Sequence, residues 1–180
     1  MPQDEDHPLG FALAQLSGIY VLAQNRHGLV VVDMHAAHER IVYEKLKNAL
    51  DDDGIPTQQL LIPATMTASA LEVATAAENP ATLSRLGFEL AVIAPNALAV
   101  RCVPMTLAQA DSAQLARDVL REIAEFGGSR ALAQRRNEML STMACHPALR
   151  ATPPPTHPEI NAFAARIVAR LAAVAPAVSH

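Results

Sequence analysis

Side chains able to bind a metal ion gather between Asp33 and Glu44. Asp33 ends an apolar run, His35 follows two residues later, and Glu39 stands four residues after His35. On a helix this spacing places the imidazole and the carboxylate on one face, which is how two ligands of one divalent ion are commonly presented. His38 borders the same face. The cluster therefore predicts a metal site on which Asp33, His35 and Glu39 converge.

A structural interpretation accounts for the same residues. Asp33 and His35 would cap the start of a helix, and Glu39 would complement its dipole. Arg40 and Glu44, four residues apart, would then form an ion pair. Glu44 is rotated about 140° from Glu39 on a regular helix, so it cannot share the same ion. Periodicity alone favours this interpretation, although a cap does not require so many metal-binding side chains.

The elements around the cluster predict an α+β fold. Residues 18–24 and 29–33 read as a β-hairpin with a four-residue loop, and the unbroken apolar run at 29–32 predicts a central strand covered on both faces. The helix after Asp33 is expected at 36–50. Further strands are expected at 60–67, 88–93 and 97–103, and further helices at 69–78, 80–86, 111–126, 130–150 and 158–174.

Composition argues against a domain that binds DNA strongly by itself. The chain has 180 residues, 51% of them hydrophobic, and a formal charge of -4. A domain that holds DNA by itself is usually basic, so we expect DNA binding to be weak. Two cysteines without a CxxC pair, an acidic N-terminus and no long apolar run predict a soluble intracellular protein of a reducing cytoplasm. Residues 1–8 read as the remnant of a linker.

Residues 33–44 resemble the nuclease motif of the MutL family of DNA mismatch repair proteins, Asp-Gln-His-Ala-x-x-Glu-x-x-x-x-Glu. The matching positions are Asp33, His35, Ala36, Glu39 and Glu44, with Met34 in place of Gln. The resemblance implies a metal-dependent endonuclease that nicks DNA. By this resemblance Asp33 and Glu39 are catalytic, and Asp33, His35 and Glu39 bind zinc, manganese or magnesium.

A second stretch is similar to the sliding-clamp-binding motif of the same family. Its residues are Gln58, Leu60, Leu61, Ile62 and Pro63. In a short extended peptide, the polar Gln would set the register and an aliphatic side chain would fill a hydrophobic pocket on the clamp. The alternative is an ordinary strand in which Leu60 and Ile62 face the core.

Cys145 resembles the second metal motif of the family, a cysteine near the end of a long helix followed by a basic residue. The adjacent His146 favours a role as a ligand over that of a small buried residue. Cys102, by contrast, alternates with apolar neighbours and is expected in the core. The chain departs from endonuclease-active relatives because no Cys-x-His-Gly-Arg-Pro segment follows Cys145. Either this segment is missing or altered, or a substitute donor comes from His146, His157 or His180.

The resemblance also implies two subdomains and a set of partners. Residues 9–52 and 137–174 would form a dimerisation subdomain from both ends of the chain, residues 57–135 an inserted regulatory subdomain, and residues 175–180 a tail. The expected partners are a second copy of the chain, the replication sliding clamp, MutS and, weakly, DNA. No nucleotide is expected here, because nothing resembles the ATPase half of the family. A purely structural dimerisation module with a vestigial metal site is the alternative.

Overall fold

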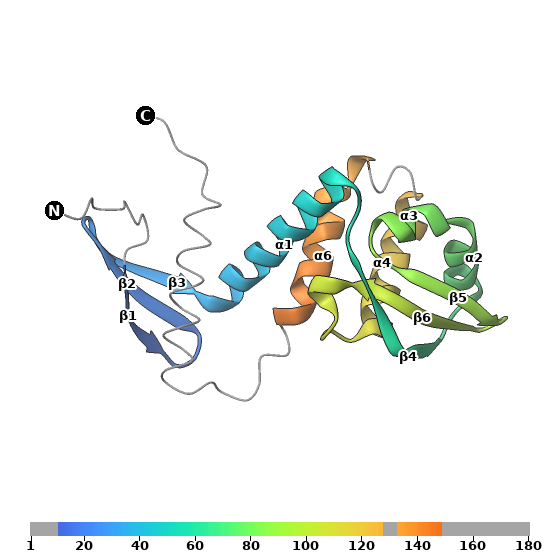
Figure 1. Ribbon diagram of the computed structural model, residues 1–180, viewed down its shortest axis with the longest axis horizontal. Helices are drawn as coiled ribbons and strands as arrows, with labels where there is room; N and C mark the ends of the chain where they lie inside the picture. The colour runs from blue at the N-terminus through green and yellow to red at the C-terminus, as the bar shows by residue number, and fades with distance from the viewer. Residues whose placement is uncertain (1–10, 128–132, 149–180) are drawn as a thin grey trace. The chain divides into compact units, whose positions relative to one another are not determined.

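The computed structural model describes residues 11–127 and 133–148, and this part of the chain has the mixed α and β composition predicted (Figure 1). It contains two three-stranded sheets, each with antiparallel neighbours, together with helices. Contacts divide the chain into two units, and among the described residues the first contains residues 11–41 and the second begins at Val42. Each unit is described by itself. In the described residues, no helix is long and apolar enough to cross a membrane.

The first sheet has the order β1-β2-β3, with strands β1 (Phe11–Leu16), β2 (Tyr20–Asn25) and β3 (Gly28–Asp33). The predicted hairpin is confirmed. Its loop is shorter than expected because Asn25 already pairs with Gly28. The Asn25 side chain accepts hydrogen bonds from the backbone N–H groups of His27 and Gly28 at 2.9 and 3.1 Å, which closes the turn.

Strand β3 lies at an edge of this sheet, so the prediction of a central strand covered on both faces is wrong. The central strand is β2, whose Val21 and Ala23 are fully buried. Leu29 and Val31 of β3 are instead 63% and 58% exposed. An unbroken apolar run indicated that both faces are apolar, but it could not tell whether this chain itself covers them.

Helix α1 (Met34–Asp52) follows β3 directly and contains the boundary between the two units. Val42, Leu46 and Leu50 are spaced four residues apart and form a buried seam on one face of the helix. They belong to the core of the second unit. Helix α6 (Arg136–Ala148) contributes Met139 and Met143 to the same core. Packing thus groups helix α6 and the second half of helix α1 with the second unit. The sequence analysis assigned both to the dimerisation subdomain, and that functional assignment stays a prediction.

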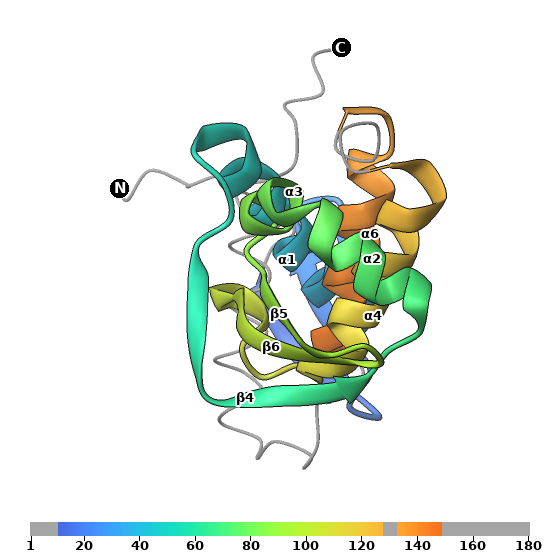
Figure 2. The ribbon, with the colours of Figure 1, turned by 90° about the vertical axis from the view of Figure 1, so that its right-hand side faces the viewer.

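The second sheet has the order β4-β6-β5, and Figure 2 shows β4 running along its edge. Its strands are β4 (Thr57–Thr67), β5 (Glu89–Ala94) and β6 (Ala97–Pro104). Helices α2 (Ala70–Glu78), α3 (Pro80–Arg85) and α4 (Ser112–Phe126) pack on this sheet, and a short 3-10 helix η1 (Met105–Leu107) follows β6. These elements agree with the predicted ones to within a few residues.

The core of the second unit forms between this sheet and its helices. Its largest fully buried side chains include Leu86, Leu98, Leu107, Leu115, Leu120, Ile123 and Leu140. Helix α4 buries one face, and Asp111 caps it by accepting a hydrogen bond from the backbone N–H of Gln114 at 3.2 Å. A packed core of this kind gives the edge strand β4 a rigid support.

Candidate functional site

Asp33 is the N-cap of helix α1. One of its carboxylate oxygens, Oδ1, accepts hydrogen bonds from the backbone N–H groups of His35 and Ala36 at 2.8 and 3.1 Å. These two N–H groups belong to the first turn and have no partner within the helix. The structural interpretation of Asp33 as a capping residue is therefore confirmed. Its assignment as a metal ligand stays a prediction.

The other predicted metal ligands lie in both units. His35 is exposed and Glu39 is half-buried on the first turns of α1, whereas Cys145 and His146 are half-buried on α6 in the second unit. Among residues 11–127 and 133–148, no three His, Cys, Asp or Glu side chains are grouped closely enough to hold a metal ion. His157 and His180 lie outside the described residues.

His146 contacts a carboxylate that the sequence analysis did not single out. Its Nε2 lies 3.0 Å from Oδ2 of Asp118 on α4, and both side chains are largely buried. Because a carboxylate only accepts, the imidazole donates from Nε2. One turn away, the Thr142 hydroxyl donates to Glu122. The two pairs tie α6 to α4, and no local sequence pattern connects these residues.

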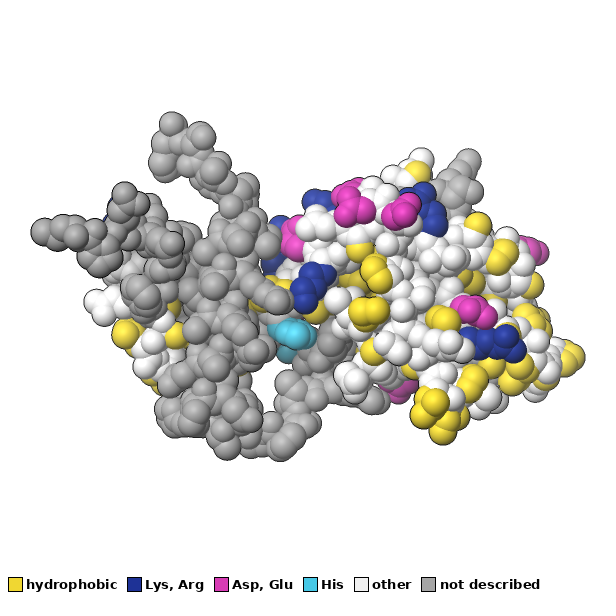
Figure 3. Space-filling model, in the orientation of Figure 1, with side chains coloured by type: hydrophobic (Ala, Val, Ile, Leu, Met, Phe, Trp, Pro, Cys, Tyr) yellow, Lys and Arg dark blue, Asp and Glu magenta, His cyan; other side chains and the backbone are white. Residues whose placement is uncertain are grey.

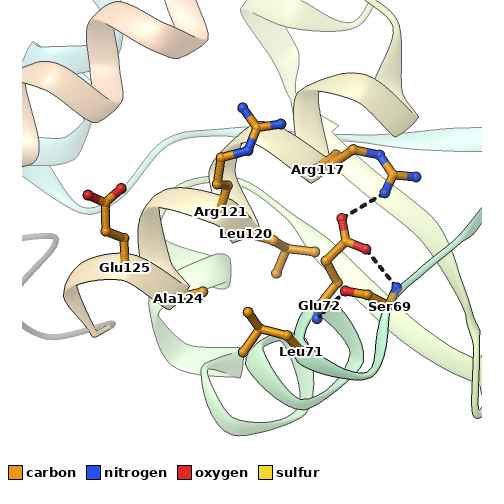
Figure 4. Close-up of a pocket in the computed structure, with 8 residues that line it drawn as sticks. All are labelled: Ser69, Leu71, Glu72, Arg117, Leu120, Arg121, Ala124 and Glu125. Atoms are coloured by element: carbon orange, nitrogen blue, oxygen red, sulfur yellow. Dashed lines mark hydrogen bonds and ion pairs between the residues drawn. The ribbon is translucent and has the colours of Figure 1, made fainter.

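A hollow of about 500 Å³ lies between helices α2 and α4 (Figure 4). Its apolar lining comes from Leu71, Leu120 and Ala124. At one end, Glu72 meets Arg117 of α4 at 2.7 Å and also completes a capping box with Ser69. Burial raises the pKa of Glu72, but the hydrogen bonds from Ser69 and the charge and hydrogen bond of Arg117 outweigh it and hold the pKa below its usual value of 4.5.

The predicted clamp-binding segment interrupts the pairing of edge strand β4. Gln59 pairs with Cys102 of β6, and Ala64 pairs with Val100. Four residues of β4, 60–63, therefore lie opposite a single residue of β6 and project from the sheet. We call residues 60–63 the projecting segment.

The side chains of the projecting segment have different environments. Leu61 is 99% exposed and Ile62 is 81% exposed, whereas Leu60 packs against the core. The alternative in which Leu60 and Ile62 both face the core is therefore wrong for Ile62. Apolar side chains are scattered over the visible face of this unit, and acidic and basic side chains gather along its upper edge and in a pair farther right (Figure 3).

The first sheet carries an apolar face, made by Leu16, Tyr20, Leu22, Leu29 and Val31. Their cross-strand register places these side chains on the same side: Leu16 is opposite Tyr20, and Leu22 is opposite Val31. All but the half-buried Leu22 are exposed. A monomeric protein rarely leaves so many neighbouring large apolar side chains in water, so this face has the character of an interaction surface.

Two small α+β units, one with an apolar sheet face and one with a projecting apolar segment, define a protein interaction module. The family model described as the MutL C terminal dimerisation domain matches residues 13–154. The chain belongs to this family.

Individual relatives agree with the family model. The DNA mismatch repair protein MutL of Janthinobacterium sp. (strain Marseille) is 59% identical over 160 residues, which are 89% of this chain and 26% of the relative. MutL of Thiobacillus denitrificans is 58% identical over 156 residues, or 87% of this chain and 26% of the relative. MutL of Pseudomonas aeruginosa (strain LESB58) is 52% identical over 156 residues, which are 87% of this chain and 25% of the relative. The chain thus spans about a quarter of the length of these relatives.

Proposed function

We propose that this chain is the homodimerising module of a bacterial DNA mismatch repair protein of the MutL type, working in the cytoplasm. The apolar face of the first sheet carries the proposal, together with the family's description as a dimerisation domain. Two copies that pack this face against each other would remove Leu29 and Val31 from water. Burial of a large aliphatic side chain contributes roughly 1.5–3 kcal/mol, so a few such residues from each copy could drive association.

The oligomeric state tests this proposal. Light scattering of the purified chain at micromolar concentration should give twice its mass of 19.2 kDa. Val31→Glu places a charge in the middle of the apolar face and should shift the protein to monomers. Val92→Glu is the matched control, because Val92 is similarly exposed on a strand of the other sheet and its replacement should leave the dimer intact. A parent chain that scatters as a monomer would remove the proposal.

We further propose that the projecting segment binds the replication sliding clamp. The observation that favours this is the exposure of Leu61 and Ile62, held between two paired stretches of β4. A segment already extended before binding loses less conformational entropy than a flexible peptide. Gln58, whose side-chain amide now donates to the backbone carbonyl of Gln59 at 3.1 Å, would add a polar contact.

Clamp binding can be measured with a purified bacterial sliding clamp. Replacing Leu61 and Ile62 together by Ala should weaken binding at least about tenfold, because both side chains would fill apolar pockets on the partner. The matched control replaces Val92 and Ile93, two exposed aliphatic residues of β5, by Ala. Equal loss in both variants would show that the effect is not specific to the projecting segment.

Metal-dependent nicking of DNA is a separate proposal. It is supported by the motif at Asp33, His35 and Glu39, whose oxygen and nitrogen donors suit zinc, manganese or magnesium. In the described residues Asp33 caps α1 and no three His, Cys, Asp or Glu side chains form a group, so the contacts on hand supply no metal geometry. We therefore derive no catalytic step from it. MutS and DNA are proposed as further partners on the family resemblance alone.

A plasmid assay separates the enzyme from the structural module. Supercoiled plasmid is incubated with the purified chain and Mn²⁺, with Asp33→Asn as the comparison. Nicking that requires Asp33 would establish the endonuclease. Intact plasmid from a folded dimer would support the structural alternative for this chain.

A further inference from the structure

Arg101 lies beside the projecting segment although it is 38 positions away from Pro63 in the sequence. On β6, Val100 pairs with Ala64 and Cys102 pairs with Gln59, so Arg101 is the one residue of β6 between these two pairs. The projecting segment occupies the same interval on β4. The strand register thus places a positively charged residue opposite the projecting segment, whose Leu61 and Ile62 are the most exposed large hydrophobic residues among those described in the second unit.

Arg101 forms only a weak ion pair within the chain. Its Nη1 lies 3.8 Å from Oε1 of Glu89 on β5, and the two side chains are 55% and 59% exposed. An ion pair this exposed and this long contributes little to stability, because water screens both charges. Glu89 also accepts a hydrogen bond from the Cys102 thiol at 3.5 Å. The guanidinium can therefore turn to a carboxylate of a partner at small cost.

We propose that Arg101 is part of the clamp-binding surface and makes a charged contact beside the apolar contact of Leu61 and Ile62. This inference rests on the proposed binding of the clamp. The partner it fits is a clamp surface with an apolar pocket and a carboxylate at its rim, because a guanidinium presents a planar fork that matches a carboxylate. Charged contacts at the rim of an interface mainly raise the rate of association and the selectivity for the partner.

The test compares charge variants of the chain against a purified bacterial sliding clamp. We expect Arg101→Gln to weaken binding about twofold and Arg101→Glu about fivefold or more at about 50 mM salt, mostly through slower association. At about 500 mM salt, screening should remove most of the difference. Arg121→Gln is the matched control, since Arg121 is an exposed arginine on helix α4 and its replacement should not change binding.

The outcomes distinguish the role of Arg101 from the proposed binding of the clamp by the projecting segment. If the double Ala variant at Leu61 and Ile62 loses binding while Arg101→Glu binds like the parent, clamp binding stands and the role of Arg101 is refuted. If the double Ala variant binds like the parent, both are refuted. A circular dichroism melt of each variant shows that the fold is retained. A weakening by Arg101→Glu that persists unchanged at high salt would also contradict a charged contact.

Discussion

At the scale of single residues, Asp33 shows how one side chain can satisfy two descriptions. Its spacing to His35 and Glu39 suits a metal ligand, and its contacts are those of a helix cap. The two roles make different demands on the side chain. A cap needs one hydrogen-bond acceptor, which Asn also provides, whereas a ligand of a divalent ion needs the negative charge.

Substitutions at Asp33 should follow the pattern expected of a cap. Asp33→Ala should lower the free energy of unfolding by about 1 kcal/mol, and Asp33→Asn should change it by only a few tenths. Urea unfolding followed by circular dichroism measures both. A large loss in the Asn variant, or metal content in the parent that the Asn variant lacks, would mean that the charge itself is required.

Glu72 should make the stability of the second unit depend on pH. Hydrogen bonds and the Arg117 charge hold its pKa below 4.5. A carboxyl with a lowered pKa stabilises the folded state above its unfolded pKa, and the contribution disappears as the pH falls through the folded pKa. The stabilisation should thus be complete at neutral pH and decline as the solution is acidified below about pH 4.5.

The variant that isolates this charge is Glu72→Gln, because Gln also completes a capping box. At pH 7 it should unfold about 1 kcal/mol more easily than the parent, since it loses the charged contact with Arg117. The difference should shrink as the pH is lowered toward 3. Denaturant unfolding at several pH values measures it, and a difference that does not vary with pH would contradict the assignment.

At the scale of elements, the pairing of α4 with α6 depends on polar contacts as well as on apolar packing. Asp118 and Glu122 are four residues apart on α4, and Thr142 and His146 are four apart on α6. One helical turn thus separates the two pairs on each helix. The contacts set which turn of α6 faces which turn of α4.

Removing Asp118 should destabilise this helix pair. Asp118→Ala leaves the largely buried His146 without its acceptor, so we expect a loss of about 1–3 kcal/mol in the free energy of unfolding. Arg121→Ala removes only one exposed partner of Asp118, which also accepts a hydrogen bond from the Gln114 side chain, and should cost less than about 0.5 kcal/mol. A double-mutant cycle with His146→Ala measures the coupling. Additive losses would show that the contact contributes nothing to stability.

The sequence also missed strand β1 (Phe11–Leu16) as an element. Its segment contains no β-branched residue and two alanines, a composition that has little intrinsic preference for a strand. Pairing with β2 makes it a strand, and that pairing depends on the whole sheet. The hairpin of β2 and β3 was predictable because its turn is local and depends on Asn25 and Gly28.

At the scale of the whole molecule, association should contribute to stability. A sheet of three strands is close to the minimum for independent folding, and the first sheet leaves an apolar face exposed. If two copies cover this face, unfolding requires their separation, so stability rises with concentration.

Unfolding of a dimer should therefore shift with protein concentration. We expect the free energy of unfolding per dimer to rise by about 1.4 kcal/mol for each tenfold increase in concentration. Urea midpoints of the parent at low and high micromolar concentration measure this. The Val31→Glu variant should show no such shift, and a parent midpoint independent of concentration would argue against coupled folding and association.

The sequence by itself determined the family and most of the local elements, and it nominated the residues of the candidate sites. The motif at Asp33 identified the MutL C-terminal domain, and the comparisons confirm it. The helices expected at 69–78 and 111–126 were also readable, because caps and helical periodicity depend on residues a few positions apart.

Only the tertiary structure decided which strands are edges and which distant side chains meet. Strand order depends on pairing between segments far apart in the chain. The sequence therefore could not show that β3 lies at an edge or that residues 60–63 interrupt the pairing of β4. His146 meets Asp118 across 28 positions, and Arg101 lies beside the projecting segment, for the same reason. The spacing of residues in the sequence indicates which chemistry a side chain is capable of. Packing between distant segments determines which other side chain it contacts.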